Sequence, residues 1–184
     1  AFKKACRGYG RIVLVPGHSG IGKTSLVQYL EKPVEFENGL FVTGKFDQYQ
    51  LNTPYYAFRQ ALKKLWNKIF LSNQSKHSEI AVKIRESVGD LGFLLAELIP
   101  EMNDIFSDQP QLEDSNINSI EAKHRFTTVI RKFIEIVSLP EHPVVIFIDD
   151  WQWADSASLE LLKDLHDENV LRYFLIIAAY RDEE

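Results

Sequence analysis

An octapeptide near the start of the printed sequence constrains the fold of this chain more than any other feature. It reads Gly17-His18-Ser19-Gly20-Ile21-Gly22-Lys23-Thr24 and fits the spacing G-x-x-x-x-G-K-[ST]. Four fixed positions match by chance in roughly 1 window of 25,000, so a chance match within this chain has a probability under about 1%. An apolar run at residues 12–15 precedes the octapeptide, and a helical pattern follows it. This context predicts a phosphate-binding loop between a buried strand and a helix.

Each fixed position of the loop has a physical role in holding a polyphosphate. Gly17 and Gly22 permit backbone angles and a close approach that a Cβ would block, so that successive N–H groups can surround phosphate oxygens. The positive end of the following helix adds to this attraction. Lys23 is expected to place its ammonium on the β- and γ-phosphates, and Thr24 to offer its hydroxyl to Mg²⁺. The alternative is a glycine-rich turn with an incidental lysine.

We therefore expect ATP and Mg²⁺ as the cofactors of this chain. Nucleotide contacts are expected from the loop and the residue after it: Gly17, His18, Ser19, Gly20, Ile21, Gly22, Lys23, Thr24 and Ser25. The side chains at the variable positions His18 and Ser19 are expected to face solvent or to pack locally.

A second group of candidate residues follows the apolar run at residues 144–148. Asp149 and Asp150 would be costly at the end of a buried strand unless a cation lies there. We assign Asp149 to Mg²⁺, and Asp150 to the attacking water as base or orienter. A turn cap after a core strand is the alternative. A contact of Gln152 with water or γ-phosphate stays open, while loop packing of Trp151 and Trp153 and capping of the next helix by Asp155 are the main expectations.

A third candidate, Arg181, follows the apolar run at residues 174–179. Ligands bind at the carboxyl ends of strands in open parallel sheets, so Arg181 could reach the γ-phosphate and report its presence. The alternative is a solvated charge. Lys45 and Asp47, after the second apolar run, are weaker candidates, for which a local ion pair or solvent exposure is the main expectation.

The order of apolar and helical segments predicts the fold class. Short apolar runs at residues 12–15, 40–43, 144–148 and 173–180 are separated by helical patterns. This predicts an α/β fold with a mostly parallel sheet covered on both faces. Helices are expected at residues 23–31, with Pro33 just past the end, after Thr53-Pro54, and at residues 120–137 and about 156–167. The long segment between the second and third strands predicts a helical insertion beside the sheet.

Composition restricts the remaining function classes. The 184 residues suggest one domain, residues 1–184. The net charge of -5 and the lack of a basic stripe argue against nucleic acid as a partner. Cys6 has no disulfide partner, and no apolar run reaches the roughly 18 residues of a membrane span. We expect a cytoplasmic protein. Because the chain starts without Met and stops just after an apolar run, we expect a fragment of a larger protein.

Five stretches carry a family resemblance: residues 13–26, 43–48, 52–58, 142–162 and 176–182. They are similar to the ATPase module of the STAND class, signal-transduction ATPases related to AAA+ and Orc1-like proteins. The resemblance is strongest to the subgroup in large bacterial kinases, between a serine/threonine kinase domain and GAF and histidine-kinase domains. Its most specific part is the run D-D-W-Q-W-A-D-S that begins at Asp149.

The resemblance implies a P-loop NTPase sandwich with strand order 2-3-4-1, a fifth strand beyond this chain, and Arg181 as a sensor near the γ-phosphate. It also implies selection of adenine. Trp151 stands where the family often has a smaller apolar residue. The helical and winged-helix parts that complete the nucleotide pocket in such proteins are expected outside residues 1–184.

Three functions remain open at this point. The main one is an ATP-binding switch with slow hydrolysis that regulates attached signalling domains, with a nucleotide-dependent oligomer as a further partner arrangement. The second is a nucleotide-binding module that needs other domains for turnover. The third is a small-molecule phosphotransferase with the same loop, for which the sequence shows no acceptor-orienting base.

Overall fold

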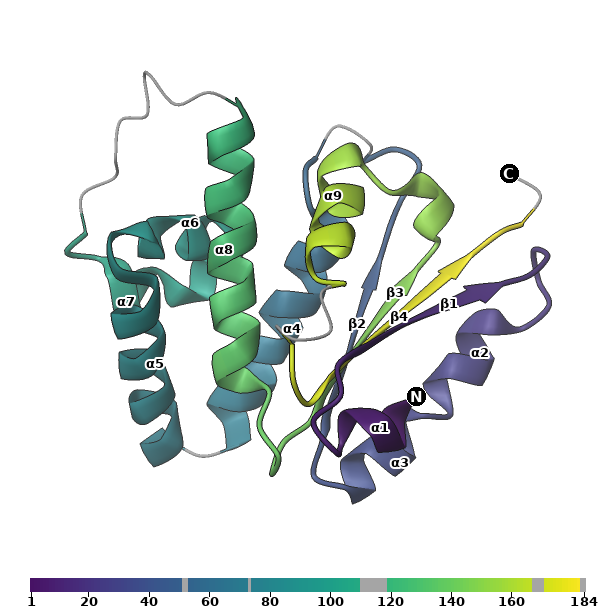
Figure 1. Cartoon of the computed structure of the whole chain (residues 1–184), viewed down its shortest axis with the longest axis horizontal. Helices are drawn as coiled ribbons and strands as arrows, with labels where there is room; N and C mark the ends of the chain where they lie inside the picture. Colours follow the sequence, from purple (N-terminus) through teal and green to yellow (C-terminus); the bar gives the residue numbers. More distant parts are fainter. Residues whose placement is uncertain (51–52, 73, 110–118, 167–170, 183–184) are drawn as a thin grey trace.

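A four-stranded parallel sheet forms the centre of the molecule, with helices against both faces (Figure 1). The computed structural model describes residues 1–50, 53–72, 74–109, 119–166 and 171–182. The strands are β1 (Arg11–Pro16), β2 (Leu40–Lys45), β3 (Val144–Asp149) and β4 (Phe174–Tyr180). Their order is β1-β4-β3-β2, and each neighbouring pair is parallel. The expected α/β class and the strand order are confirmed.

The alternation of side chains along the central strands creates two separate cores, because successive residues of a strand point to opposite faces. Val145 and Phe147 of β3 pack toward the short helices α1 (Phe2–Ala5), α2 (Lys23–Gln28) and α3 (Glu31–Phe36). Ile146 and Ile148 pack on the other face, with the insertion and with α9 (Ser156–Asp164). Both faces of β3 and β4 are therefore buried, which explains their unbroken apolar runs.

The helix expected at residues 23–31 is in fact two helices. The first, α2, ends at Gln28, and α3 begins at Glu31 with Pro33 in its first turn. Proline is tolerated in the first turn of a helix, because the N–H that it lacks has no partner within the helix there. The expectation that Pro33 lies past the helix was therefore wrong.

The segment between β2 and β3 forms the predicted helical insertion (Figure 1). Its α-helices are α4 (Tyr56–Ser72), α5 (Gln74–Val88), α6 (Gly92–Leu98), α7 (Asn103–Phe106) and α8 (Ser119–Val137). In the described part of this segment, the 3₁₀ turn η1 (Gly89–Leu91) lies between α5 and α6, and η2 (Pro100–Met102) lies between α6 and α7. The buried side chains of these helices belong to the same core as one face of the sheet, so the insertion packs onto the sheet instead of standing apart from it.

The start of α4 differs from the expectation of a cap at Thr53. The helix begins at Tyr56, and the carbonyl of Tyr55 accepts the first helical bond, from the N–H of Arg59 at 2.8 Å. Tyr55 has a φ of 60°, an unusual left-handed angle for an aromatic residue. Its ring is buried and stacks on Phe126 of α8, so tertiary packing fixes this helix start.

A close backbone contact joins β2 to α4. A Cβ added at Gly44 would lie 2.0 Å from the carbonyl oxygen of Ala57 and 3.0 Å from Ile148 Cδ1. Glycine at this position lets the helix approach the strand more closely than any other residue would permit.

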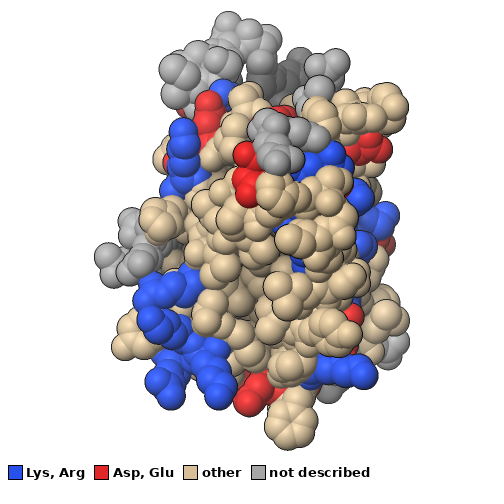
Figure 2. All heavy atoms as spheres, turned by 90° about the vertical axis from the view of Figure 1, so that its right-hand side faces the viewer, with Lys and Arg blue, Asp and Glu red and all other residues tan. Residues whose placement is uncertain are grey.

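The middle of the side that carries β1 and α2 is uncharged, charged side chains of both signs lie around its rim, and Lys and Arg gather at one lower corner (Figure 2). Leu14 of β1 is 54% exposed, and Leu26 of α2 is 66% exposed. In the described sheet β1 is an edge strand. The fifth strand that the family resemblance implies stays a prediction. No helix within the described residues has the length and apolar character needed to cross a membrane.

Candidate nucleotide site

The octapeptide of residues 17–24 connects the carboxyl end of β1 to the start of α2. Gly22 has a φ of 95° and immediately precedes the helix, and Gly20 has a φ of 74°. Both angles are in the left-handed region, where residues with a Cβ are strained. The role expected for Gly22 agrees with this geometry, whereas the requirement for glycine at position 20 was not anticipated.

Lys23 lies against its own loop. Its Nζ donates a hydrogen bond of 2.8 Å to the carbonyl oxygen of His18 and another to that of Gly17. The ammonium is thus held over the segment whose backbone would surround a phosphate. The imidazole of His18 is largely exposed, with Nδ1 3.6 Å from an Asp182 carboxylate oxygen, so the loop also approaches the end of β4.

Thr24 and Asp149 are in direct contact. The hydroxyl of Thr24 donates a 2.7 Å hydrogen bond to Asp149 Oδ2, although the two residues lie on α2 and on β3. Asp149 is 8% exposed, and its Oδ1 accepts a 3.0 Å hydrogen bond from the N–H of Asp150. The topology explains the meeting, because β3 and the loop after β1 reach the same edge of the sheet.

These two side chains fit the chemistry of a magnesium site. A hydroxyl and a carboxylate are hard oxygen donors, and Mg²⁺ commonly uses one or two protein ligands together with phosphate oxygens and waters. Among the described residues, no three His, Cys, Asp or Glu side chains cluster as a metal cage. Such a cage is not needed for a cation that is shared with a nucleotide.

Asp150 lies in a sharp turn of the backbone, and its carboxylate interacts with Lys45 and Gln152. Its φ of 53° and ψ of 44° are left-handed, a conformation that Asp tolerates better than most residues. Its Oδ2 lies 3.0 Å from Lys45 Nζ, and its Oδ1 accepts a 3.1 Å hydrogen bond from Gln152 Nε2. The ion pair thus joins the ends of β2 and β3.

The surroundings of Asp150 shift its pKa. Partial burial raises the pKa of this carboxyl, but the hydrogen bonds from Lys45 and Gln152 and the charges of Lys45 and Arg181 outweigh burial. The pKa therefore lies below its ordinary value. The hydrogen bond to Asp150 correspondingly raises the pKa of Lys45. Asp150 is thus ionised but weakly basic.

Arg181 is half-buried at the end of β4, and its backbone N–H donates a 3.2 Å hydrogen bond to Gln152 Oε1. Together with Lys45 and Asp150 it lines an open cleft of about 580 Å³, which also includes Trp153. The structure therefore brings the three sequence-predicted groups, at the ends of β1, β3 and β4, to one edge of the sheet. The γ-phosphate contact of Arg181 stays a prediction.

Sequence reasoning missed two contacts of this edge. The Lys45–Asp150 pair joins residues that were considered separately, and Gln152 was considered only for a contact with water or γ-phosphate. The register of the sheet, which sets Lys45 opposite Asp149, brings the first pair together, and no pattern in the sequence gives that register. Asp155 caps α9 as expected, with its Oδ1 accepting from the N–H of Ser158 at 2.9 Å.

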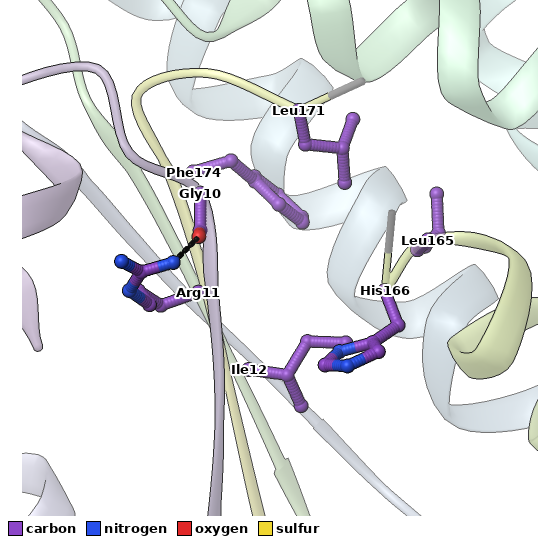
Figure 3. Close-up of a pocket in the computed structure, with 7 residues that line it drawn as sticks. All are labelled: Gly10, Arg11, Ile12, Leu165, His166, Leu171 and Phe174. Atoms are coloured by element: carbon purple, nitrogen blue, oxygen red, sulfur yellow. Dashed lines mark hydrogen bonds between the residues drawn. The ribbon is translucent and has the colours of Figure 1, made fainter. Parts of the chain in front are cut away.

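A second cavity lies at the opposite ends of the strands (Figure 3). It has a volume of about 60 Å³ and is lined by Gly10, Arg11, Ile12, Leu165, His166, Leu171 and Phe174. Pockets for molecules of nucleotide size are several hundred Å³. This cavity is therefore not a candidate for nucleotide binding.

Comparison with known proteins agrees with the geometry. The profile of a family described as the AAA ATPase domain matches residues 1–177. The chain belongs to the AAA ATPase domain family. As an AAA ATPase domain it is implied to bind nucleotide, typically with Mg²⁺. The resemblance noted in the sequence is thereby confirmed at the level of this family.

One relative of this AAA ATPase domain is the hybrid signal transduction histidine kinase G of Dictyostelium discoideum. The two are 29% identical over 167 residues, which cover 91% of this chain. The chain corresponds to 5% of the length of that kinase, so the relative is a much larger protein.

Proposed function

We propose that this AAA ATPase domain binds ATP with Mg²⁺ and hydrolyses it slowly, as a regulatory module of a larger signalling protein. The observation that carries the proposal is the 2.7 Å contact between Thr24 and Asp149 beside a loop of phosphate-binding sequence. A turn cap after a core strand, the alternative for Asp149, would not require this contact.

Each residue at this edge has a distinct role in the proposal. Residues 17–25 hold the triphosphate through backbone N–H groups, and Lys23 adds a positive charge. Thr24 and Asp149 would hold Mg²⁺, which would supply positive charge to stabilise the charge of the triphosphate. Asp150 orients the attacking water, and Arg181 contacts the γ-phosphate.

The surroundings of Asp150 support slow turnover. Hydrogen bonds engage both of its carboxylate oxygens, and its pKa is below the ordinary value, so it accepts a proton poorly. Each carboxylate oxygen has two lone pairs, which leaves capacity to orient a water. This agrees better with a switch than with a fast metabolic enzyme.

The regulatory part of the proposal rests on the relative, whose name describes a signal transduction histidine kinase. We propose that nucleotide state controls flanking signalling domains of the same chain in the cytoplasm, and that nucleotide also controls any oligomer. Membership of the STAND class belongs to the same proposal.

The decisive experiment replaces Lys23. Calorimetric titration with ATP in magnesium buffer should show affinity at least about tenfold weaker for Lys23→Ala, because a charge-assisted contact to phosphate is lost. Lys32→Ala is the matched control, since Lys32 is an exposed lysine of α3. Unchanged ATP affinity in Lys23→Ala would contradict the proposal.

A nucleotide-binding module without turnover is the second candidate, and the engagement of both Asp150 oxygens favours it. Phosphate release measured on residues 1–184 and on a longer chain with its flanking domains separates the two candidates. Release from the longer chain alone, with ATP bound by residues 1–184, would favour the second.

A further inference from the structure

Gln152 occupies a bridging position at the edge that carries the phosphate loop. Its carboxamide donates 3.1 Å to Asp150 Oδ1 and accepts 3.2 Å from the N–H of Arg181. One side chain thus connects the carboxylate after β3 with the backbone at the end of β4. Both the nitrogen and the oxygen of the carboxamide form hydrogen bonds. Packing of the loop alone would not require either bond.

We propose that Gln152 is a positioning residue that couples the orientation of the Asp150 carboxylate to the position of the end of β4. The inference rests on the proposed hydrolytic function for its catalytic consequence. The coupling itself is a property of the folded chain and can be measured without turnover.

The turn that presents Gln152 is held rigidly. Gln152 is the middle residue of η3 (Trp151–Trp153), and the N–H of Trp153 donates 3.0 Å to the carbonyl of Asp150. The ring of Trp151 is 9% exposed and meets Phe46 and Phe58 edge-on, at centroid distances of 5.2 and 6.0 Å. This buried anchor holds the backbone from which the Gln152 side chain extends to the bridge.

The bridge gives Asp150 two constraints from two different strands. Lys45 at the end of β2 holds Oδ2, and Gln152 holds Oδ1 with its other end on β4. A shift of the Arg181 backbone, for example when its side chain contacts a γ-phosphate, would therefore move Gln152 Oε1, which accepts from the Arg181 N–H. The other end of the carboxamide would then change the direction of the Asp150 carboxylate. Gln152 is the physical link between the proposed sensor and the proposed water-orienting acid.

Two variants separate the two ends of the bridge. Gln152→Met removes both hydrogen bonds with little change in volume. Gln152→Glu keeps an acceptor for Arg181 but places a carboxylate oxygen against Asp150. We expect both to lower kcat at least about tenfold, while the Kd of ATP stays within about twofold. Gln28→Met, at an exposed position of α2, is the matched control and should leave both constants unchanged.

Amide exchange of Arg181, followed by NMR, tests the bridge independently of hydrolysis. Exchange should be at least about tenfold faster in Gln152→Met and close to wild type in Gln152→Glu. Unchanged exchange in Gln152→Met would overturn the inference, as would a loss of ATP affinity equal to the loss of kcat. A wild-type chain that binds ATP but never releases phosphate would contradict the proposed hydrolysis, while the exchange result would still decide the bridge.

Discussion

Lys45 and Asp150 form an ion pair of 3.0 Å between the ends of β2 and β3. The Lys45 side chain is 65% exposed and that of Asp150 is 22% exposed, so solvent screens much of the attraction. The pair therefore contributes little to stability, under about 1 kcal/mol by comparison with other exposed pairs. Its larger effect is on the orientation and basicity of a carboxylate beside the proposed nucleotide site.

Removal of this cation should increase ATP hydrolysis. Lys45→Met deletes the strongest interaction that lowers the pKa of Asp150 but leaves the Gln152 bridge that orients it, so the carboxylate becomes a better base in an unchanged position. We expect a severalfold higher kcat, on the order of 3-fold, with the free energy of unfolding changed by less than about 1 kcal/mol. Phosphate release and urea unfolding measure the two effects. Lys45→Arg keeps the charge and is the control, and a lower kcat in Lys45→Met would refute this role.

Asp149 should account for the magnesium dependence of ATP binding. Asp149→Asn removes the negative charge beside the Thr24 hydroxyl, and we expect ATP affinity in magnesium buffer to fall at least about tenfold. Removal of Mg²⁺ with EDTA should weaken binding in the wild type and have little further effect in the variant. Thr24→Ser keeps the hydroxyl and should keep the dependence, whereas Thr24→Val should lose it. Full magnesium dependence in Asp149→Asn would exclude this residue as a ligand.

Tyr55 should make the protein less stable in strong alkali. Burial, followed by the nearby charges of Asp155, Glu160 and Asp164, raises the pKa of Tyr55 to about 12. The unfolded chain therefore ionises at a lower pH than the folded chain. The contribution of Tyr55 is fully present below its unfolded pKa of about 10 and is lost as the pH rises from there toward 12.

Urea unfolding between these pH values should show the loss of about 1–2 kcal/mol from this group. Comparison with Tyr55→Phe isolates it from the other groups that ionise in alkali, because that variant keeps the ring stacked on Phe126. If the free energy of unfolding changed with pH equally in the wild type and in Tyr55→Phe, folding would not raise the pKa of Tyr55.

Gly44 should not tolerate a Cβ. Alanine there would press on the Ala57 carbonyl and on Ile148, and overpacking of this kind costs roughly 1–3 kcal/mol or more. Gly89 provides the control, because its φ of 55° strains alanine by about 1 kcal/mol but no atom lies within 4 Å of its added Cβ. The midpoint of thermal unfolding should be lower for Gly44→Ala than for Gly89→Ala, and the reverse order would contradict the steric argument.

The fold was predictable where burial dominates. Strands that are buried on both faces have unbroken apolar runs. Helices that are buried on one face, as in the insertion, repeat apolar residues at helical spacing. Local signals failed where tertiary contacts decide. Pro33 lies inside α3, and α4 begins at Tyr56, after the left-handed Tyr55, where a cap at Thr53 was expected. The end of α9 expected at residue 167 lies outside the described residues; the helix is assigned to Asp164.

The candidate site was predictable as three separate groups. The spacing of residues 17–24 and the acids after β3 carry chemical meaning in the sequence itself. The contacts among the groups depend on register and on the left-handed turn at Asp150, which aims its side chain at Lys45 and Gln152. The pattern of apolar and polar residues does not reveal that one residue, Asp150, has a positive φ angle. These contacts could therefore be found only in the structure.

The close contact at Gly44 has a mechanical consequence. Gly44 directly precedes Lys45, and the backbone of α4 lies where its side chain would otherwise be. A contact between two backbones cannot absorb a displacement by a change of rotamer. A displacement of α4 is therefore passed directly to the backbone of β2 beside Lys45, the residue that restrains Asp150.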